Sequence, residues 1–219
     1  MSSALSTGSI SINCQKTTFD TNTATGSGGL FSISSGYQRP VDLTFNSVIA
    51  KLTSITGIGG GGGILYTPPT STSSIVTIGA STFISNTVAG NGGLFYLEGT
   101  DSKSVTINTA TSISGTSAGG KGGLIYINSK SQTVVFSGVT LVENTQSTLE
   151  GGIYYPEFPS IGPNTLSLTL FQSTFTNFKS PVEGSFLVVN SLGSPVVTVS
   201  ISQTSLACKP NDLYWNFPT

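Results

Sequence analysis

The hydrophobic positions of this chain fall into short runs that return at a regular interval. One kind of run is apolar at successive positions and follows a glycine pair, as in GGLFYLEG at 92–99 and GGLIYIN at 122–128. A second kind alternates polar and apolar residues, as in IVTI at 75–78. Short runs of these two kinds are typical of β-strands, and no stretch shows the 3.6-residue period of a helix. The pattern therefore predicts an all-β protein.

The glycine that opens each apolar phrase marks a repeat. Successive anchor glycines lie 34, 30, 30, 29 and 33 residues apart. Each repeat also holds an alternating run and a third short run that often ends in Asn, such as FDTN at 19–22 and FISN at 83–86. Three short strands in about 30 residues describe one coil of a solenoid. We expect a corner with positive φ at the anchors, which are Gly28, Gly62, Gly92, Gly122, Gly151 and Gly184.

The repeat predicts a right-handed parallel β-helix, a pectin-lyase-like solenoid of about seven coils, with residues 1–219 as a single domain. The six anchors account for six coils, and a seventh copy ends the chain as NDLYW at 211–215. A repeat of this regularity is equally compatible with a segment of a longer array. Seven of the ten prolines follow the glycine phrases, so we expect loops of variable length at that edge of the coil.

The pairing of F-x-x-N with a downstream glycine pair and [IL]-Y resembles the repeats of chlamydial polymorphic outer-membrane proteins and of similar protist surface proteins. The resemblance extends over most of the chain. It implies a right-handed β-helix and a role as a surface adhesin. The chain differs from that family in usually placing Leu or Ile, where those repeats favour Ala, after the glycines.

The apolar phrase after each glycine pair predicts a stripe on the outside of the coil. Successive side chains of a strand point to opposite sides, and the first residue of the phrase is aliphatic or Phe, which suits the interior. The next residue then points outward, and its column forms an apolar stripe on the order of 30 Å long. We interpret it as a lateral contact surface, unless loops cover it. The stripe residues are Phe31, Leu65, Phe95, Ile125, Tyr154, Leu187 and Tyr214.

Composition narrows the functional classes. Charged residues make up 8% of the chain and the net charge is −1. The chain therefore lacks the excess of basic residues that is typical of nucleic-acid-binding proteins. Histidine is absent, which removes the commonest general base and metal ligand. The apolar runs are too short to span a membrane, and the first residues, MSSALSTGS, are not a signal peptide. We therefore expect an extracellular or cell-surface protein that is not an enzyme and has neither metal nor cofactor.

Two pairs of reactive residues are the candidates for chemistry. Glu150 and Glu183 precede anchor glycines on neighbouring coils, about 5 Å apart, with Lys121 one coil away. Their corner is open to solvent, so we interpret them as a solvated charge column and not as a glycosidase pair. Cys14 and Cys208 belong to the first and seventh coils, on the order of 29 Å apart, which is too far for a disulfide. We expect Cys14 to act as a small core residue.

Hydroxyl residues precede the core position of the F-x-x-N run in most coils. Aligned threonines on a flat β-helix face are what ice-binding proteins use. The alternative is a corner ladder in which hydroxyls relieve unpaired backbone groups. Lys51 stands in place of the hydroxyl in the second coil, which counts against a regular ice face. The ladder residues are Thr18, Thr82, Ser112, Thr140, Thr174 and Ser205.

The sequence thus predicts a structural or adhesive β-helix of an extracellular surface layer or filament. It would associate with copies of itself or with neighbouring surface proteins, through the apolar stripe or through its coil ends. Ice binding by the hydroxyl ladder is the first alternative. Carbohydrate binding or lyase-like processing, with a glycan as partner, is the second.

Overall fold

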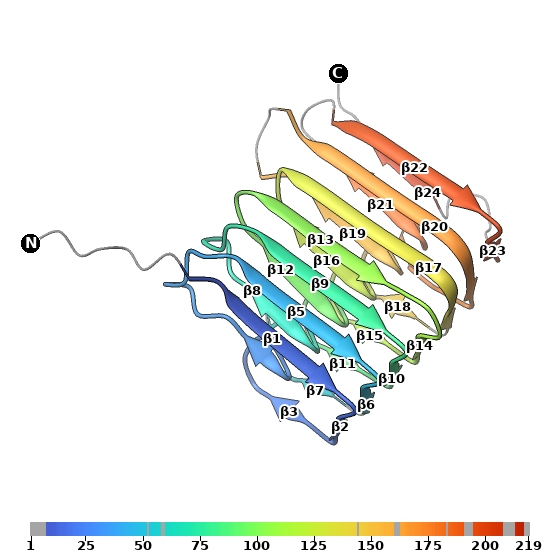
Figure 1. The fold of residues 1–219 in the computed structure, drawn as a ribbon. Coiled ribbons are helices and arrows are strands. Elements are labelled where there is room, and N and C mark those ends of the chain that lie inside the picture. Colours follow the sequence, from blue (N-terminus) through green and yellow to red (C-terminus); the bar gives the residue numbers. More distant parts are fainter. Residues whose placement is uncertain are drawn as a thin grey trace, which may run out of the picture.

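The computed structural model describes residues 8–51, 53–57, 60–143, 145–159, 163–182, 184–190, 195–207 and 213–216. Within them the chain forms parallel β-strands and turns, with no helix. Figure 1 shows the strands stacked along one axis, from β1 at the blue end to β22 at the red end. Neighbours in a stack lie about 30 residues apart in sequence, so the chain winds as a coil of about six turns. The predicted β-solenoid is confirmed.

The longest strands form one stack. They are β1 (Ile10–Gln15), β5 (Val41–Asn46), β9 (Ser74–Gly79), β13 (Ser102–Ile107), β17 (Ser131–Glu143), β20 (Thr165–Thr176) and β22 (Val196–Ser202). A second stack follows across a corner, and β17 and β20 run through that corner and join the two stacks into one 12-stranded sheet. The other members of the second stack are β2 (Thr18–Asp20), β6 (Ile49–Lys51), β10 (Thr82–Ile84), β14 (Ser112–Ser114) and β23 (Ser205–Leu206).

Two further sheets close the coil. The five-stranded sheet contains β3 (Thr23–Ala24), β7 (Ser54–Ile55), β11 (Thr87–Val88), β15 (Ser117–Ala118) and β18 (Gln146–Ser147). The seven-stranded sheet contains β4 (Phe31–Ser32), β8 (Leu65–Thr67), β12 (Phe95–Glu98), β16 (Ile125–Asn128), β19 (Tyr154–Glu157), β21 (Leu187–Asn190) and β24 (Leu213–Asn216).

The core consists of apolar rows that run along the axis. On the long strands, alternation turns every second side chain inward, and the register stacks like residues on one another. One such row has exposed fractions of 0–1% and contains Leu43, Val76, Val105, Val134 and Leu168. Burial of these rows supplies the main driving force for the coil, because apolar burial contributes roughly 25 cal/mol per Å².

The glycine pairs form the corner before the seven-stranded sheet, which we call the glycine corner. All six anchor glycines have φ between 60° and 72°, as the sequence predicts. The second glycine serves a different purpose, since a Cβ atom on Gly93 would lie 2.1 Å from the carbonyl oxygen of Gly123 in the next coil. The motif therefore needs one glycine for its backbone angle and one for the close approach of two coils.

The other two corners turn mostly on non-glycine residues at positive φ. We call the turn between the long strands and the second stack the first corner, and the turn between the second stack and the five-stranded sheet the second corner. Gly138 at the first corner and Gly115 at the second are the exceptions. At the first corner Lys16, Ser47, Ala80, Ala110, Gln172 and Gln203 have φ between 47° and 59°. At the second corner the positive-φ residues are Thr21, Ser85, Gly115 and Asn177. Each described corner thus turns on a left-handed residue.

The first and last coils are less buried than the middle ones. The inward side chains Ile10, Ile12 and Cys14 of β1 are half-buried, whereas the matching residues of β9 and β13 are 0–1% exposed. Ile201 of β22, which pairs with the fully buried Leu170, is 43% exposed. No described segment forms a helix long and apolar enough to span a bilayer.

Candidate functional site

The predicted outward stripe lies inside the coil, so this prediction is wrong. Leu65, Phe95, Ile125, Tyr154 and Leu187 are 0–1% exposed and belong to the main core cluster, and Phe31 packs against it. The hydroxyl of Tyr154 donates inward to Oε1 of Gln132 at 2.6 Å. The glycine corner extends through the residue after each pair, and the strand begins one residue later, as β12 begins at Phe95. Two successive side chains therefore point inward before alternation starts.

The last coil is also shifted against the prediction. Leu213, not Tyr214, pairs with Leu187, and Tyr214 pairs with Val188. Tyr214 therefore belongs to the row one position further along the strand. Its side chain lies outside the described residues.

The outward row of the seven-stranded sheet is a row of tyrosines. Tyr66, Tyr96, Tyr126 and Tyr155 occupy one register position on β8, β12, β16 and β19, and we call them the tyrosine row. The ring centroids of successive tyrosines are 5.3, 4.8 and 6.0 Å apart. Tyr126 and Tyr155 are only 4% and 2% exposed, while Tyr66 and Tyr96 are half-buried. The open part of the row is therefore its N-terminal half.

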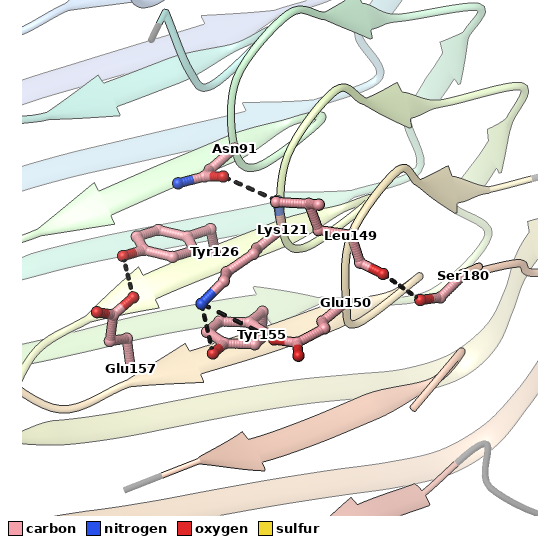
Figure 2. Close-up of polar contacts among 8 residues, drawn as sticks. All are labelled: Asn91, Lys121, Tyr126, Leu149, Glu150, Tyr155, Glu157 and Ser180. Carbon is pink, nitrogen blue, oxygen red and sulfur yellow. Dashed lines mark hydrogen bonds and ion pairs between the residues drawn. The ribbon is translucent and has the colours of Figure 1, made fainter. Parts of the chain in front are cut away.

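Lys121 lies over the buried end of the tyrosine row, as Figure 2 shows. Its ammonium donates to the hydroxyl of Tyr155 at 2.7 Å, lies 4.3 Å from the ring centroid and is 3.8 Å from Oε2 of Glu150. Burial disfavours the charged lysine, but the Tyr155 hydrogen bond and nearby Glu157 and Glu150 outweigh it, so the pKa of Lys121 is raised. The neighbours of Lys121 therefore stabilise its charged form.

Two carboxylates bond to the tyrosine row from the next outward row. The hydroxyl of Tyr126 donates to Oε2 of Glu157 at 2.5 Å (Figure 2), and burial together with this carboxylate raises the pKa of Tyr126. Burial raises the pKa of Glu98, although hydrogen bonds with Tyr96 and Asn128 oppose the shift. Tyr126 with Glu157, Tyr96 with Glu98, and Lys121 with Tyr155 and Glu150 therefore form a network of paired hydroxyls, carboxylates and one ammonium on this surface.

The predicted charge column is described only in part. Lys121 and Glu150 occupy neighbouring coils and pair with each other, but Glu183 lies outside the described residues. Within the part of the chain that the structure describes, no three His, Cys, Asp or Glu side chains come together in a group that could hold a metal ion. The tyrosine row and the polar side chains beside it could contact a partner through aromatic rings and hydrogen bonds.

Lys103 is a buried charge that sequence reasoning missed. Its side chain is 1% exposed and points into the coil from β13. The ammonium donates to Oγ of Ser71 at 2.7 Å, to the carbonyl oxygen of Thr72 at 2.6 Å and to Oγ of Ser74 at 3.2 Å. Burial lowers the pKa of Lys103 to about 8, against a smaller opposite effect of Asp101. The lysine ties the loop after β8 to the long-strand sheet.

The hydroxyl ladder is interrupted and differs in membership from the prediction. The row runs Thr18, Ile49, Thr82, Ser112, Leu141, Thr174, Ser205. Thr140 pairs with Ser173, one position away, and Lys51 pairs with Asp20 and Ile84 instead of standing in the ladder. A register shift between Ser137 and Thr140 accounts for the displaced threonine. Ile49 and Leu141 are 38% and 37% exposed, so the ladder is no continuous hydroxyl face.

The hydroxyls one position earlier stabilise the first corner. Ser81 donates to the carbonyl oxygen of Gly79 at 2.8 Å and accepts from the N–H of Val48 at 3.1 Å. Hydroxyls bonded to carbonyls two or three residues before them are the local bonds that turns use. These observations favour the corner-ladder interpretation. The same kind of bond, at 2.8–2.9 Å, is made by Thr17, Thr111, Ser173 and Thr204.

The outer face of the long strands carries a more regular threonine row. Among the described outward positions of the long strands before the first corner, Asp42 is the only charged residue. The periodicity places these positions outside, but the sequence reasoning did not single them out. We call this row the flat-face row, and it consists of Asn13, Thr44, Thr77, Thr106, Val135, Thr169 and Ser200.

Cys14 occupies the core position that was predicted for it. It pairs with Phe45 on β5, packs against the core and is a free thiol. Burial raises its pKa. Cys208 lies outside the described residues.

The ends of the long-strand stack are edge strands without the usual protection. Among the described residues β1 pairs only with β5, and β22 pairs only with β20. Exposed edges normally carry charged residues, proline or a bulge that prevents pairing with another chain. The strands ISINCQ and VVTVSIS contain neither charge nor proline. Within the described residues, neither edge strand thus carries the charge or proline that usually prevents pairing with a further strand.

No protein-family model, no curated protein and no solved structure matches this chain.

Proposed function

We propose that the chain is a non-catalytic structural or adhesive solenoid of an extracellular surface layer or filament. Copies of it associate head to tail through β22 of one copy and β1 of the next. The observation that carries the proposal is the pair of uncharged, proline-free edge strands. A head-to-tail contact that does not close on itself generates a filament.

The rows of the coil favour this direction of stacking. The register carries Ile10 into the row of Val197 and Ile12 into the row of Val199. A second copy placed one strand spacing, about 4.8 Å, beyond β22 would therefore continue these rows with aliphatic residues. Outward hydroxyl and amide positions would meet positions of the same kind. The stack would bury the half-exposed apolar side chains of both terminal coils.

The tyrosine row supports the non-catalytic part of the proposal. A general base or nucleophile needs a group that is free to reach a substrate. Several described titratable groups of this surface instead bond to one another, as Tyr126 does with Glu157 and Lys121 with Tyr155. The half-buried rings of Tyr66 and Tyr96 are the part of this face that a partner could contact.

The test places charges on the edge strand. The variant Thr198→Lys with Ser200→Lys puts two lysines on exposed positions of β22, which should block pairing. Its control, Thr77→Lys with Thr106→Lys, adds the same charges to the same face of inner strands. We expect concentration-dependent rods from the wild type and the control, by sedimentation velocity and electron microscopy, and single particles from the edge variant. A wild type that stays a single particle at every concentration would contradict the proposal, as would unimpaired assembly of the edge variant.

Ice binding is a second candidate, because the flat-face row supports it better than the predicted ladder does. Thr44, Thr77, Thr106 and Thr169 stand in one register position on a parallel sheet. The measurement is thermal hysteresis and ice-crystal shaping. The variant Thr77→Tyr with Thr106→Tyr should abolish both effects, and Thr82→Tyr, on the second stack, should keep them. A wild type without hysteresis or shaping removes this candidate.

A further inference from the structure

Five polar side chains line the inside of the second corner. Each immediately precedes a strand of the five-stranded sheet, and the parallel pairing of those strands stacks the five residues on successive coils. We call them the second-corner row. They are Asn22, Thr53, Asn86, Thr116 and Thr145.

The members of this row are buried without hydrogen-bond partners. Thr53, Asn86, Thr116 and Thr145 are 0% exposed. The hydroxyls of the three threonines, both polar atoms of the Asn86 amide and the amide nitrogen of Asn22 have no partner among the described residues. A buried polar group without a partner is strongly unfavourable, and a row of them calls for a bound group that supplies the missing bonds.

The backbone beside the row already has its partners. The carbonyl oxygens of Asn22, Thr53, Asn86, Thr116 and Thr145 each accept an N–H from the next coil at 2.8–3.0 Å. Side chains at equivalent positions of neighbouring coils can bond directly, as Thr165 does to Ser131 at 3.0 Å, but the buried polar atoms of the second-corner row make no such bond although their strands are about 4.8 Å apart. Two hydrogen bonds of about 2.8 Å that meet at a near-tetrahedral angle span about 4.5 Å. One water between neighbouring coils therefore fits the spacing.

The chemistry of the row favours water over an ion. The row contains amides and hydroxyls and no carboxylate, so it offers nothing to balance the charge of a cation. Thr145 also lines a surface cavity of about 480 Å³ together with Ser117, Gln146 and Lys179. This cavity therefore lies beside the C-terminal end of the described row.

We infer that the second-corner row binds a file of ordered water molecules, held between successive coils inside the solenoid. Each water bridges the side chains of two neighbouring coils and so satisfies donors and acceptors that the protein leaves unpaired. Buried waters typically make about three hydrogen bonds and belong to the folded structure. This assigns a role to the Asn of the F-x-x-N repeat at Asn22 and Asn86, independent of the proposed assembly.

The test replaces a hydroxyl by a methyl group of nearly the same shape. If Thr116 binds water, Thr116→Val removes one of its bonds and lowers the unfolding temperature by about 2–4 °C. If the row is dry, the same change removes an unpaired buried hydroxyl and raises the unfolding temperature. Thr111→Val, in the same coil at the first corner, is the matched control. Its hydroxyl bonds to the carbonyl oxygen of Asn108 at 2.8 Å, so its loss is destabilising in either case.

Water is counted directly by oxygen-17 magnetic relaxation dispersion, which reports molecules with long residence times. The wild type should hold several such waters, Thr116→Val should lose at least one and Thr111→Val should lose none. A wild type without long-lived waters, or an unchanged count in Thr116→Val, overturns the inference. Where the unfolding temperature and the number of long-lived waters disagree, the number of waters is decisive.

Discussion

The first and second corners use similar residue types and satisfy them differently. At the first corner the hydroxyl of Ser81 bonds to the carbonyl oxygen of Gly79, two residues back. At the second corner Asn86 and Thr116 are buried without a described partner for their side chains. Both corners turn on a residue with positive φ, as Ala80 and Ser85 show. The residue type alone therefore does not tell whether a Ser or Thr at a corner bonds to a carbonyl of its own turn. At the second corner such a side chain instead points into the coil, where we propose that it binds water.

The largest effect should come from filling the space opposite the second-corner row. A Cβ atom on Gly93 would lie 2.1 Å from the carbonyl oxygen of Gly123 and 2.6 Å from Cγ2 of Thr116. We expect Gly93→Ala to lower the free energy of unfolding by about 3 kcal/mol, measured by urea denaturation. Gly36→Ala is the control, because nothing lies within 4 Å of its Cβ position. Equal stability of the two variants would disprove this account of the glycine pair.

Lys103 extends the comparison to a buried charge that does have partners. Its folded pKa of about 8 lies below the value of about 10.4 for an unfolded lysine. Between these values the unfolded chain binds more protons, so the lysine makes stability rise with pH from about 8 to about 10, by at most about 3 kcal/mol. The measurement is the free energy of unfolding from pH 7 to 9.5, for the wild type and Lys103→Met. The difference between the two should change with pH, and a constant difference would show that Lys103 titrates normally.

Breaking the first corner should have an intermediate effect. Ser81→Ala removes the bond to Gly79 and leaves the buried N–H of Val48 without its acceptor. We expect a loss of about 2 kcal/mol in the free energy of unfolding. Ser112→Ala, on the outward side of the same corner, should change it by less than about 0.5 kcal/mol. Similar losses in both variants would contradict the role assigned to the inward hydroxyls.

The smallest effect should come from the surface, where water competes with every partner. Lys121→Met removes an ion pair with Glu150 and a contact with the ring of Tyr155. We expect a loss of about 0.5–1 kcal/mol, which shrinks as salt is added. Lys130→Met, at an exposed position, should have no measurable effect. A loss that does not respond to salt would indicate packing by the lysine side chain instead of charge.

The coil and its glycine corners could be predicted from the sequence because they depend on a repeat. Gly62 and Gly92 recur where the backbone needs a positive φ, and Cys14 occurs where the alternating run places a core residue. Repetition of this kind survives in a single sequence, since each coil supplies an independent copy of the same requirement. The register between the long strands of successive coils follows from the spacing of the repeat.

The site could not be predicted, because alternation does not hold across a corner. Leu94 and Phe95 both point inward, and a period of two cannot represent two successive inward residues. The missed signal was the tyrosine at the same place in three successive strands, LYT, FYLE and IYIN, since Tyr prefers a site with one polar side. The buried Lys103 gave no signal in the sequence at all.

In the part of the chain that the structure describes, each coil pairs only with the coils on either side of it, and the middle coils are the best buried. The order of folding follows from this arrangement. Contacts between successive coils join residues about 30 positions apart, so one pair of middle turns can form a nucleus without the rest of the chain. The structure then grows outward one turn at a time, and amide protons of β9 and β13 should exchange with solvent most slowly.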